Sequence, residues 1–381
     1  MPAATTSTLT RSVLTLVALG RLVLGWGAVL LLLATGSLLR PPVPTPLLVG
    51  ALVLIVAVIL VCAFGVVHEA EHLARRLGDP YGSLVLTLSI VLIEVVLISA
   101  VMLGPGDHTT IGRDSVMAVS MIILNAVIGL CLLVGGLRHG GLAHNRTGTS
   151  AYLVMLVVLS SLAFALPALI GSGGSYTTGQ AVPVVALTVL LYAFFLYRQM
   201  GAQAGDFREV EARVPAPVDE HGGIGQVIAE HRTELLLRAG LLVVTVLPIV
   251  LLSHDMASLL DDGLGRLGAP VALSGILIAV IVFLPESITS VRAALRGEIQ
   301  RVSNLCHGAL VSTVGLTIPS VLVIGGLTGQ RVVLAESPAN LLLLGVSLLL
   351  TAVTFAAPRV TAVHGAAHLA VFAVYGIVVF S

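Results

Sequence analysis

Long apolar runs, separated by short polar or Pro/Gly breaks, dominate this sequence. A helix needs roughly 20 apolar residues to cross a bilayer core of about 30 Å. Eleven runs reach that length and predict an all-α polytopic membrane protein. The first run is longer than the roughly 7–15 residues of a signal-peptide core, so we interpret it as a retained helix. The predicted spans are 12–39, 46–74, 82–103, 114–137, 150–171, 181–199, 233–253, 270–295, 303–326, 333–356 and 361–380.

Composition agrees with a chain solvated mainly by lipid. Only 10% of the residues are charged and 57% are apolar, whereas soluble domains carry about 25% charged residues. The formal net charge is zero, so no overall field favours nucleic acid as a partner. The three cysteines lie in apolar runs and match no disulfide or metal spacing. They are Cys62, Cys131 and Cys306.

Arginine placement predicts the orientation, because cytoplasmic loops of membrane proteins are enriched in basic residues. With a cytoplasmic N-terminus, fourteen arginines fall inside and four outside, and the C-terminus is external. The four external residues are Arg40, Arg113, Arg266 and Arg331. The polar segment 200–232 contains two prolines and no apolar periodicity, so we expect a flexible cytoplasmic linker there.

Two short segments repeat along the chain. Residues 76–80 read Arg-Leu-Gly-Asp-Pro and residues 266–270 read Arg-Leu-Gly-Ala-Pro, each followed at a similar distance by Glu94 or Glu286. An odd number of helices per repeat places the copies in opposite orientations, as in many secondary transporters. The predicted parts are an N-terminal helix (1–45), a five-helix repeat (46–199, signature 71–137), the linker (200–232) and a second, inverted five-helix repeat (233–381, signature 266–326).

Glu94 and Glu286 carry the predicted chemistry. A helical rise of about 1.5 Å per residue puts them roughly 18 Å and 24 Å into their helices. An ionised carboxylate at that depth costs several kcal/mol unless it is paired, hydrated or protonated. A buried carboxyl with a raised pKa holds a proton until a cation displaces it. Two such groups could therefore exchange two protons for one divalent ion.

Other oxygen atoms must complete a cation shell, because calcium takes 6–8 oxygen ligands. Pro285 removes a helical hydrogen bond and exposes the carbonyl of Ile281. Small polar residues on the third, fourth and ninth spans are the further candidates, and packing between helices is their alternative role. The expected ligands are Thr87, Ser89, Asn125, Ser312 and Thr313, with Ser99, Ser120 and Asn304 nearby.

The segments from Glu71 to Glu94 and from Leu284 to Arg292 resemble the paired signature repeats of the calcium/cation antiporter superfamily, and more narrowly its bacterial calcium/proton antiporter (ChaA-like) branch. The resemblance implies that Glu94 and Glu286 alternate between proton and calcium, and that Glu71 lies at a cytoplasmic vestibule. Vacuolar and plant relatives have Gly-Asn before the acid. This chain does not, so sodium or potassium stays an alternative cation.

A different class is suggested by His68-Glu69-Ala70-Glu71-His72, which matches the H-E-x-x-H zinc-protease pattern. An intramembrane zinc metalloprotease is therefore the alternative hypothesis. In the favoured interpretation, Glu71, His68 and His72 form a titratable entrance. His364 and His368 form a proton relay or a metal pair, or else they pack between helices, and the same alternatives apply to His307.

We predict a secondary transporter of a bacterial inner (plasma) membrane. It exchanges cytoplasmic calcium, or sodium or potassium, for protons by alternating access. The transported cations and protons are its only expected partners besides the lipid bilayer, and no organic cofactor is implied.

Overall fold

The computed structural model describes residues 13–39, 43–77, 81–103, 109–210, 224–268 and 272–381. The fold divides into two compact units, each described separately below. Unit 1 comprises Met1–Gly104 and Pro217–Ala269, and unit 2 comprises Pro105–Ala216 and Pro270–Ser381.

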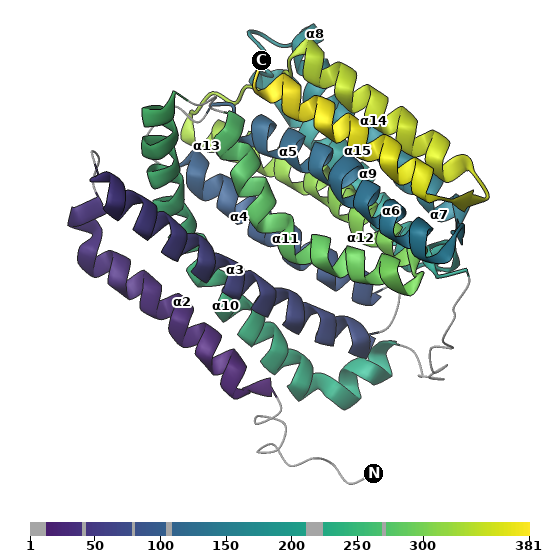
Figure 1. The fold of residues 1–381 in the computed structure, drawn as a ribbon, viewed down its shortest axis with the longest axis horizontal. Coiled ribbons are helices and arrows are strands. Elements are labelled where there is room, and N and C mark those ends of the chain that lie inside the picture. The colour runs from purple at the N-terminus through teal and green to yellow at the C-terminus, as the bar shows by residue number, and fades with distance from the viewer. Residues whose placement is uncertain (1–12, 40–42, 78–80, 104–108, 211–223, 269–271) are drawn as a thin grey trace. The chain divides into compact units, whose positions relative to one another are not determined.

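Unit 1 is built from four long helices. They are α2 (Leu16–Thr35, followed by the 3₁₀ turn η1, Gly36–Leu39), α3 (Thr45–Leu77), α4 (Tyr81–Met102) and α10 (Ile224–Leu267). Helices α2, α3 and α10 pack side by side, and α4 packs against α3 and α10 (Figure 1). The Trp26 indole N–H donates to the carbonyl of Val244 at 3.3 Å, which ties α2 to α10.

Unit 2 contains the remaining elements. Its first half holds α5 (Ile111–Met121), η2 (Ile122–Val127), α6 (Ile128–His139), β1 (Leu142–Ala143), α7 (Arg146–Ser160), η3 (Ser161–Ala165), α8 (Leu166–Ile170), α9 (Thr178–Met200) and η4 (Ala204–Phe207). Its second half holds α11 (Ala272–Arg296), α12 (Ile299–Ser312), η5 (Thr313–Thr317), α13 (Ile318–Thr328), α14 (Pro338–Ala356), β2 (Arg359–Val360) and α15 (Ala362–Val379). Strands β1 and β2 pair antiparallel, with Leu142 opposite Val360.

Close backbone contact fixes α15 against α6. A Cβ at Gly136 would lie 2.2 Å from the Ala362 nitrogen, and one at Gly365 would lie 2.4 Å from the Leu133 nitrogen. No side chain fits at either position, so these glycines permit the crossing. On its other side α15 lies beside α14 (Figure 1).

Two of the long helices are interrupted by π-helical turns at matching places. The turn η2 joins α5 to α6, and η5 joins α12 to α13. A third π-helical turn, η3, joins α7 to α8. Such turns insert one extra residue into a helix and often occur at functional sites.

Each of the eleven predicted spans coincides with a helix or an uninterrupted run of helical segments. Within the described residues, nine helices are long and apolar enough to cross a membrane, and ten if the bent α11 is one span. Helix α4, with 22 residues, matches the third predicted span. The predicted all-α polytopic architecture is therefore confirmed.

The prediction of a flexible linker over residues 200–232 is wrong at both ends of that segment. Helix α10 already begins at Ile224 and has 44 residues, so it extends well beyond the predicted span 233–253. At the other end η4 buries Phe207, and the Glu209 carboxylate accepts hydrogen bonds from the backbone N–H groups of Gln300 and Arg301. Residues 211–223 of the linker lie outside the described part of the chain.

Candidate functional site

Glu286 lies on the bent helix α11 and is only 4% exposed. The bend is 50° and separates Gly275–Ile281 from Phe283–Arg296. The bend falls about one turn before Pro285. In a straight helix the ring of Pro285 would clash with the carbonyl of the residue four positions earlier, Ile281. The bend thus lies where the sequence predicts an exposed Ile281 carbonyl. Around it, α11 packs against α5, η2, α6 and α12.

The π-helical turns of unit 2 hold two buried oxygen atoms. In η2, Asn125 donates from Nδ2 to the Ser347 hydroxyl at 2.8 Å. Its Oδ1 has no hydrogen-bond partner among the described residues, and neither has Oγ1 of Thr317 in η5. Both residues are fully buried. Buried polar atoms are nearly always hydrogen-bonded, so these two oxygens are candidate ligand atoms.

Thr317 was missed by the sequence analysis, although a signal for it exists. An offset of 192 residues relates Glu94 to Glu286, and the same offset relates Asn125 to Thr317. Applying the offset of the acids to Asn125 would have found the threonine. Sequence reasoning instead chose Ser312 and Thr313, one turn earlier.

Ser312 and Thr313 are both buried next to this turn. The Ser312 hydroxyl accepts a hydrogen bond from Tyr192 Oη at 2.8 Å, and Thr313 is the first residue of η5. Asn304 has other partners: its Nδ2 donates to the Phe207 carbonyl at 2.6 Å, and its Oδ1 accepts from Gln300 Nε2 at 3.0 Å. It thereby anchors the segment after α9.

Glu94 lies on α4 in unit 1 and is 2% exposed. On the same helix the buried Ser89 hydroxyl donates to the Val85 carbonyl at 2.7 Å, and Ser99 donates to the Val95 carbonyl. These bonds engage the hydroxyl hydrogens and leave oxygen lone pairs available. The side chain of Thr87 lies outside the described part of the structure.

Four charged residues of unit 1 form what we call the Arg238 cluster: Arg238, Glu69, Glu234 and Arg76. Arg238 Nη1 donates to Glu69 Oε2 at 2.7 Å, and its Nε donates to Glu234 Oε1 at 3.1 Å. Glu234 also lies 3.2 Å from Arg76 Nη2. The cluster ties α3 to α10, and its side chains are nearly buried except that of Arg76.

This pairing bears on the zinc-protease hypothesis. The protease mechanism needs the motif's glutamate as a general base beside two metal-bound histidines, and here Glu69 is held by an arginine. The rings of His68 and His72 lie 4.6 Å apart, edge to face. Across the described residues, no group of three or more His, Cys, Asp or Glu could hold a metal ion.

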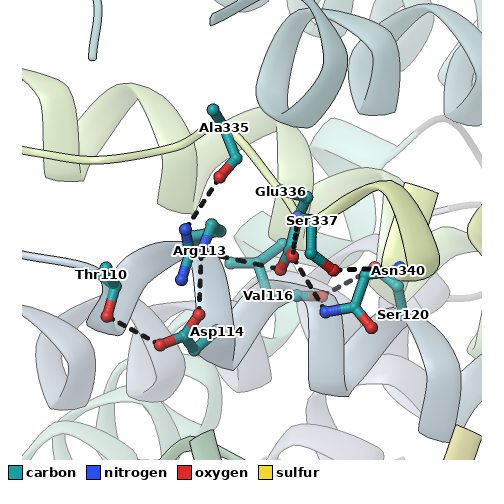
Figure 2. A network of polar contacts seen from close by, with 9 residues as sticks. All are labelled: Thr110, Arg113, Asp114, Val116, Ser120, Ala335, Glu336, Ser337 and Asn340. Carbon is teal, nitrogen blue, oxygen red and sulfur yellow. Dashed lines mark hydrogen bonds and ion pairs between the residues drawn. The ribbon is translucent and has the colours of Figure 1, made fainter. Parts of the chain in front are cut away.

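A second charged group, the Arg113 cluster, comprises Arg113, Asp114 and Glu336 in unit 2 (Figure 2). Arg113 Nε donates to Asp114 Oδ1 at 2.8 Å and lies 3.8 Å from Glu336 Oε1. Glu336 precedes α14 and is buried. Burial raises the pKa of its carboxyl above the ordinary range, and the nearby Asp114 charge adds to that shift, although the Asn340 amide, the Ser337 N–H and Arg113 oppose it.

The buried histidines of unit 2 have separate partners. His307 Nδ1 is hydrogen-bonded to the Ser303 hydroxyl at 2.9 Å, and His368 Nε2 to the Thr354 hydroxyl at 3.2 Å. His364 instead accepts from the backbone N–H of Thr361 and so caps the start of α15. His364 and His368 thus have distinct hydrogen-bond partners.

Comparison with known proteins gives consistent matches. Residues 47–201 and 237–381, close to the two predicted repeats, match the family described as sodium/calcium exchanger protein. The sodium-potassium/proton antiporter ChaA of Escherichia coli (strain K12) is 32% identical over 88% of this chain and 90% of its own length. The structure of native YfkE is similar with a TM-score of 0.67 and 14% identity, covering 94% of this chain and 99% of YfkE.

The H+/Ca2+ exchanger CAX has a similar structure as well. Its TM-score is 0.66 at 16% identity, covering 94% of this chain and 87% of CAX. At these identities the structural likeness concerns the fold alone. It confirms the predicted membrane fold with two inverted repeats.

Proposed function

This chain belongs to the sodium/calcium exchanger family of membrane cation transporters, and we propose that it exchanges cytoplasmic calcium for external protons by alternating access. Sodium or potassium is the alternative cation, because ChaA is named a sodium-potassium/proton antiporter whereas CAX is named an H+/Ca2+ exchanger. In this proposal Glu94 and Glu286 bind the cation and the protons in turn. The zinc-protease alternative is dropped, because the family consists of transporters.

One observation carries the assignment of residues. The offset of 192 residues relates both the two buried acids and the two buried oxygens of the π-helical turns, Asn125 and Thr317. Four chemically suitable groups therefore occupy equivalent positions in the two repeats. Equivalent positions of inverted repeats form the substrate sites of secondary transporters.

The chemistry follows from burial. Moving a carboxylate into an apolar helix bundle costs several kcal/mol, and a bound proton or metal cation offsets that cost. Two carboxylates match the charge of one calcium ion, and calcium requires further oxygen ligands. We assign these to Asn125 Oδ1 and Thr317 Oγ1, with Ser89, Ser312, Thr313 and Thr87 as additional candidates.

We also propose that Glu71, His68 and His72 line the cytoplasmic entrance. His68 is exposed, and Glu71 and His72 are partly exposed, so cations in water can reach them. The entrance is cytoplasmic if the N-terminus is cytoplasmic, as the arginine distribution predicts.

Proteoliposomes with an imposed pH gradient test the function. We expect calcium to dissipate the gradient, and Glu94→Gln or Glu286→Gln to reduce that flux to the level of protein-free liposomes, because a neutral amide cannot exchange a proton for a cation. Adding calcium, sodium and potassium separately identifies the transported ion.

The matched control is Glu298→Gln, which removes a partly exposed acid at the start of α12 and should keep wild-type flux. Calcium-, sodium- or potassium-dependent proton flux that survives in both site variants contradicts the assignment of the two acids. If none of the three cations moves protons with the wild-type protein, the proposed exchange itself is wrong.

A further inference from the structure

The Arg113 cluster contains none of the proposed cation ligands and has no role in the function proposed above. Arg113 and Asp114 are in the first turn of α5, and Glu336 lies 222 residues later, just before α14. Figure 2 shows the three side chains converging from these two elements. The predicted topology places this end of unit 2 outside the cell.

The hydrogen bonds of Arg113 and Asp114 go to partners other than Glu336. Arg113 Nε donates to Asp114 Oδ1 at 2.8 Å, and its Nη1 donates to the Ala335 carbonyl at 2.8 Å. The second oxygen of Asp114 accepts from the Thr110 hydroxyl at 2.8 Å. Both carboxylate oxygens of Asp114 thus accept a hydrogen bond, one of them from a charged donor.

Glu336 has a different environment. Its Oε2 accepts from the Ser337 N–H and the Asn340 amide, both at 2.9 Å. Its Oε1 is buried, has no hydrogen-bond partner within the described residues, and lies 3.8 Å from Arg113 Nε. The side chain is only 2% exposed. An ionised carboxylate with one such oxygen is costly, whereas a protonated Oε1 is not.

The charge balance of the cluster also favours a protonated Glu336. The cluster has two acids and one guanidinium, so full ionisation leaves one buried negative charge. Among the described residues, Tyr375 of α15 also faces both acids, and it supplies no positive charge. The raised pKa of Glu336 agrees with this imbalance.

We propose that Glu336 is a third proton-binding carboxyl, separate from Glu94 and Glu286, through which pH on the outer side adjusts the exchange reaction. The link to transport rests on the proposed function. Two helices connect the Arg113 cluster to the candidate ligand Asn125. Helix α5 runs directly into η2, which carries Asn125, and α14 carries Ser347, whose hydroxyl accepts a hydrogen bond from Asn125. The cluster therefore joins the two helices that hold this candidate ligand.

Ionisation of Glu336 changes the forces at this junction. When the proton leaves Oε1, the new charge attracts the Arg113 guanidinium from 3.8 Å away and competes with Asp114 for it. The pull acts between the start of α5 and the segment leading into α14. A proton bound at Glu336 removes that pull.

Infrared spectroscopy tests proton binding without requiring transport. Purified wild-type protein, free of transported cations, is titrated from acidic to alkaline pH while the carbonyl stretch of protonated carboxyl groups is recorded. We expect Glu336→Gln to lose one such band relative to the wild type, and Glu298→Gln serves as the matched control. Identical titrations of wild type and Glu336→Gln overturn the proposal.

Flux measurements test the consequence. In proteoliposomes the pH on each side is varied separately. Beyond the dependence that the exchanged protons themselves impose, we expect the wild-type rate to show a further transition with outer pH, which Glu336→Gln loses while keeping its rate at acidic outer pH. The amide resembles the protonated acid, so the variant preserves the junction. A variant with the wild-type outer-pH profile contradicts the regulatory role. A wild-type protein without flux would refute the exchange function and leave the infrared result valid.

Discussion

The two units each contain an arginine that meets two acids, but only unit 1 balances the charges. In the Arg238 cluster, Glu69 and Glu234 are matched by Arg238 and Arg76. In the Arg113 cluster, the two acids share a single guanidinium. Both groups tie a helix to a distant part of the chain, so charge count rather than topology distinguishes them.

This difference in charge balance explains how two clusters built from the same types of residue have different roles. A balanced buried group needs no proton, and its main effect is to fix α3 against α10. An unbalanced group must bind one additional positive charge, and a proton is the smallest available. We therefore interpret the Arg238 cluster as structural and the Arg113 cluster as titratable.

Of the substitutions that test this comparison, Arg238→Gln should cause the largest loss in the free energy of unfolding. It leaves two buried acids without their shared partner, and removing one member of a buried ion pair costs about 3–5 kcal/mol. We expect a loss of that size in the free energy of unfolding, measured by denaturant titration in detergent. Arg301→Gln is the control, because its ion pair with Glu298 is largely exposed and is worth about 0–1 kcal/mol. Equal losses in both variants would refute a structural role for the Arg238 cluster.

A smaller effect is expected from Arg113→Gln. Glu336 can take up a proton in this variant and remove part of the uncompensated charge, so we expect a loss of about 1–3 kcal/mol near neutral pH. The loss should grow between pH 5.5 and pH 8, because Glu336 must then ionise without its arginine. Unfolding measured at both pH values checks this.

Adding Glu336→Gln to Arg113→Gln sharpens the test. The double variant should recover stability at pH 8 and show little change at pH 5.5, since it removes the acid that loses its counter-charge. A double-mutant cycle gives the coupling between the two residues. A loss in Arg113→Gln that does not depend on pH would mean that Arg113 does not shift the pKa of Glu336.

The sequence predicted the spans well because apolar run length alone decides them. Glu94 and Glu286 were also visible, since an acid in an apolar run is conspicuous. The Arg238 cluster was not, because Glu69 and Arg238 are 169 residues apart and no local pattern reports such a contact. The H-E-x-x-H motif consequently suggested a zinc site until its glutamate was found bound to arginine.

The π-helical turns were also not predictable from the sequence, and the reason is different. One inserted residue shifts the register of a helix without changing its hydropathy, so η2 and η5 leave no trace in the apolar pattern. Thr317 was overlooked for that reason, and its partner position Asn125 was found only as a polar residue inside a span. The repeat offset, which is a property of the whole chain, carries the missing information.

The smallest predicted effect extends the comparison to Glu209, an acid whose neighbouring arginine is engaged elsewhere. Arg301 contacts Glu298 at 3.3 Å, while Glu209 accepts only backbone N–H groups from Gln300 and Arg301. Burial raises the pKa of Glu209 from 4.5 to about 7, against those hydrogen bonds. The folded state therefore binds this proton more tightly than the unfolded state, and its contribution to stability is lost as pH rises from 4.5 through about 7.

Glu209→Gln cannot ionise, so its melting temperature should fall less than that of the wild type between pH 5 and pH 8, by a difference of the order of 2 °C. Circular dichroism during heating measures it, and Glu298→Gln, which removes the neighbouring acid, serves as the control. If Glu209→Gln and the wild type lose stability in parallel, the backbone N–H groups at the start of α12 already stabilise the ionised carboxylate. In that case, a buried acid of this protein would not titrate near neutral pH merely because it lacks an arginine partner. The interpretation of Glu336 would then rest on its burial and on the Asp114 charge alone.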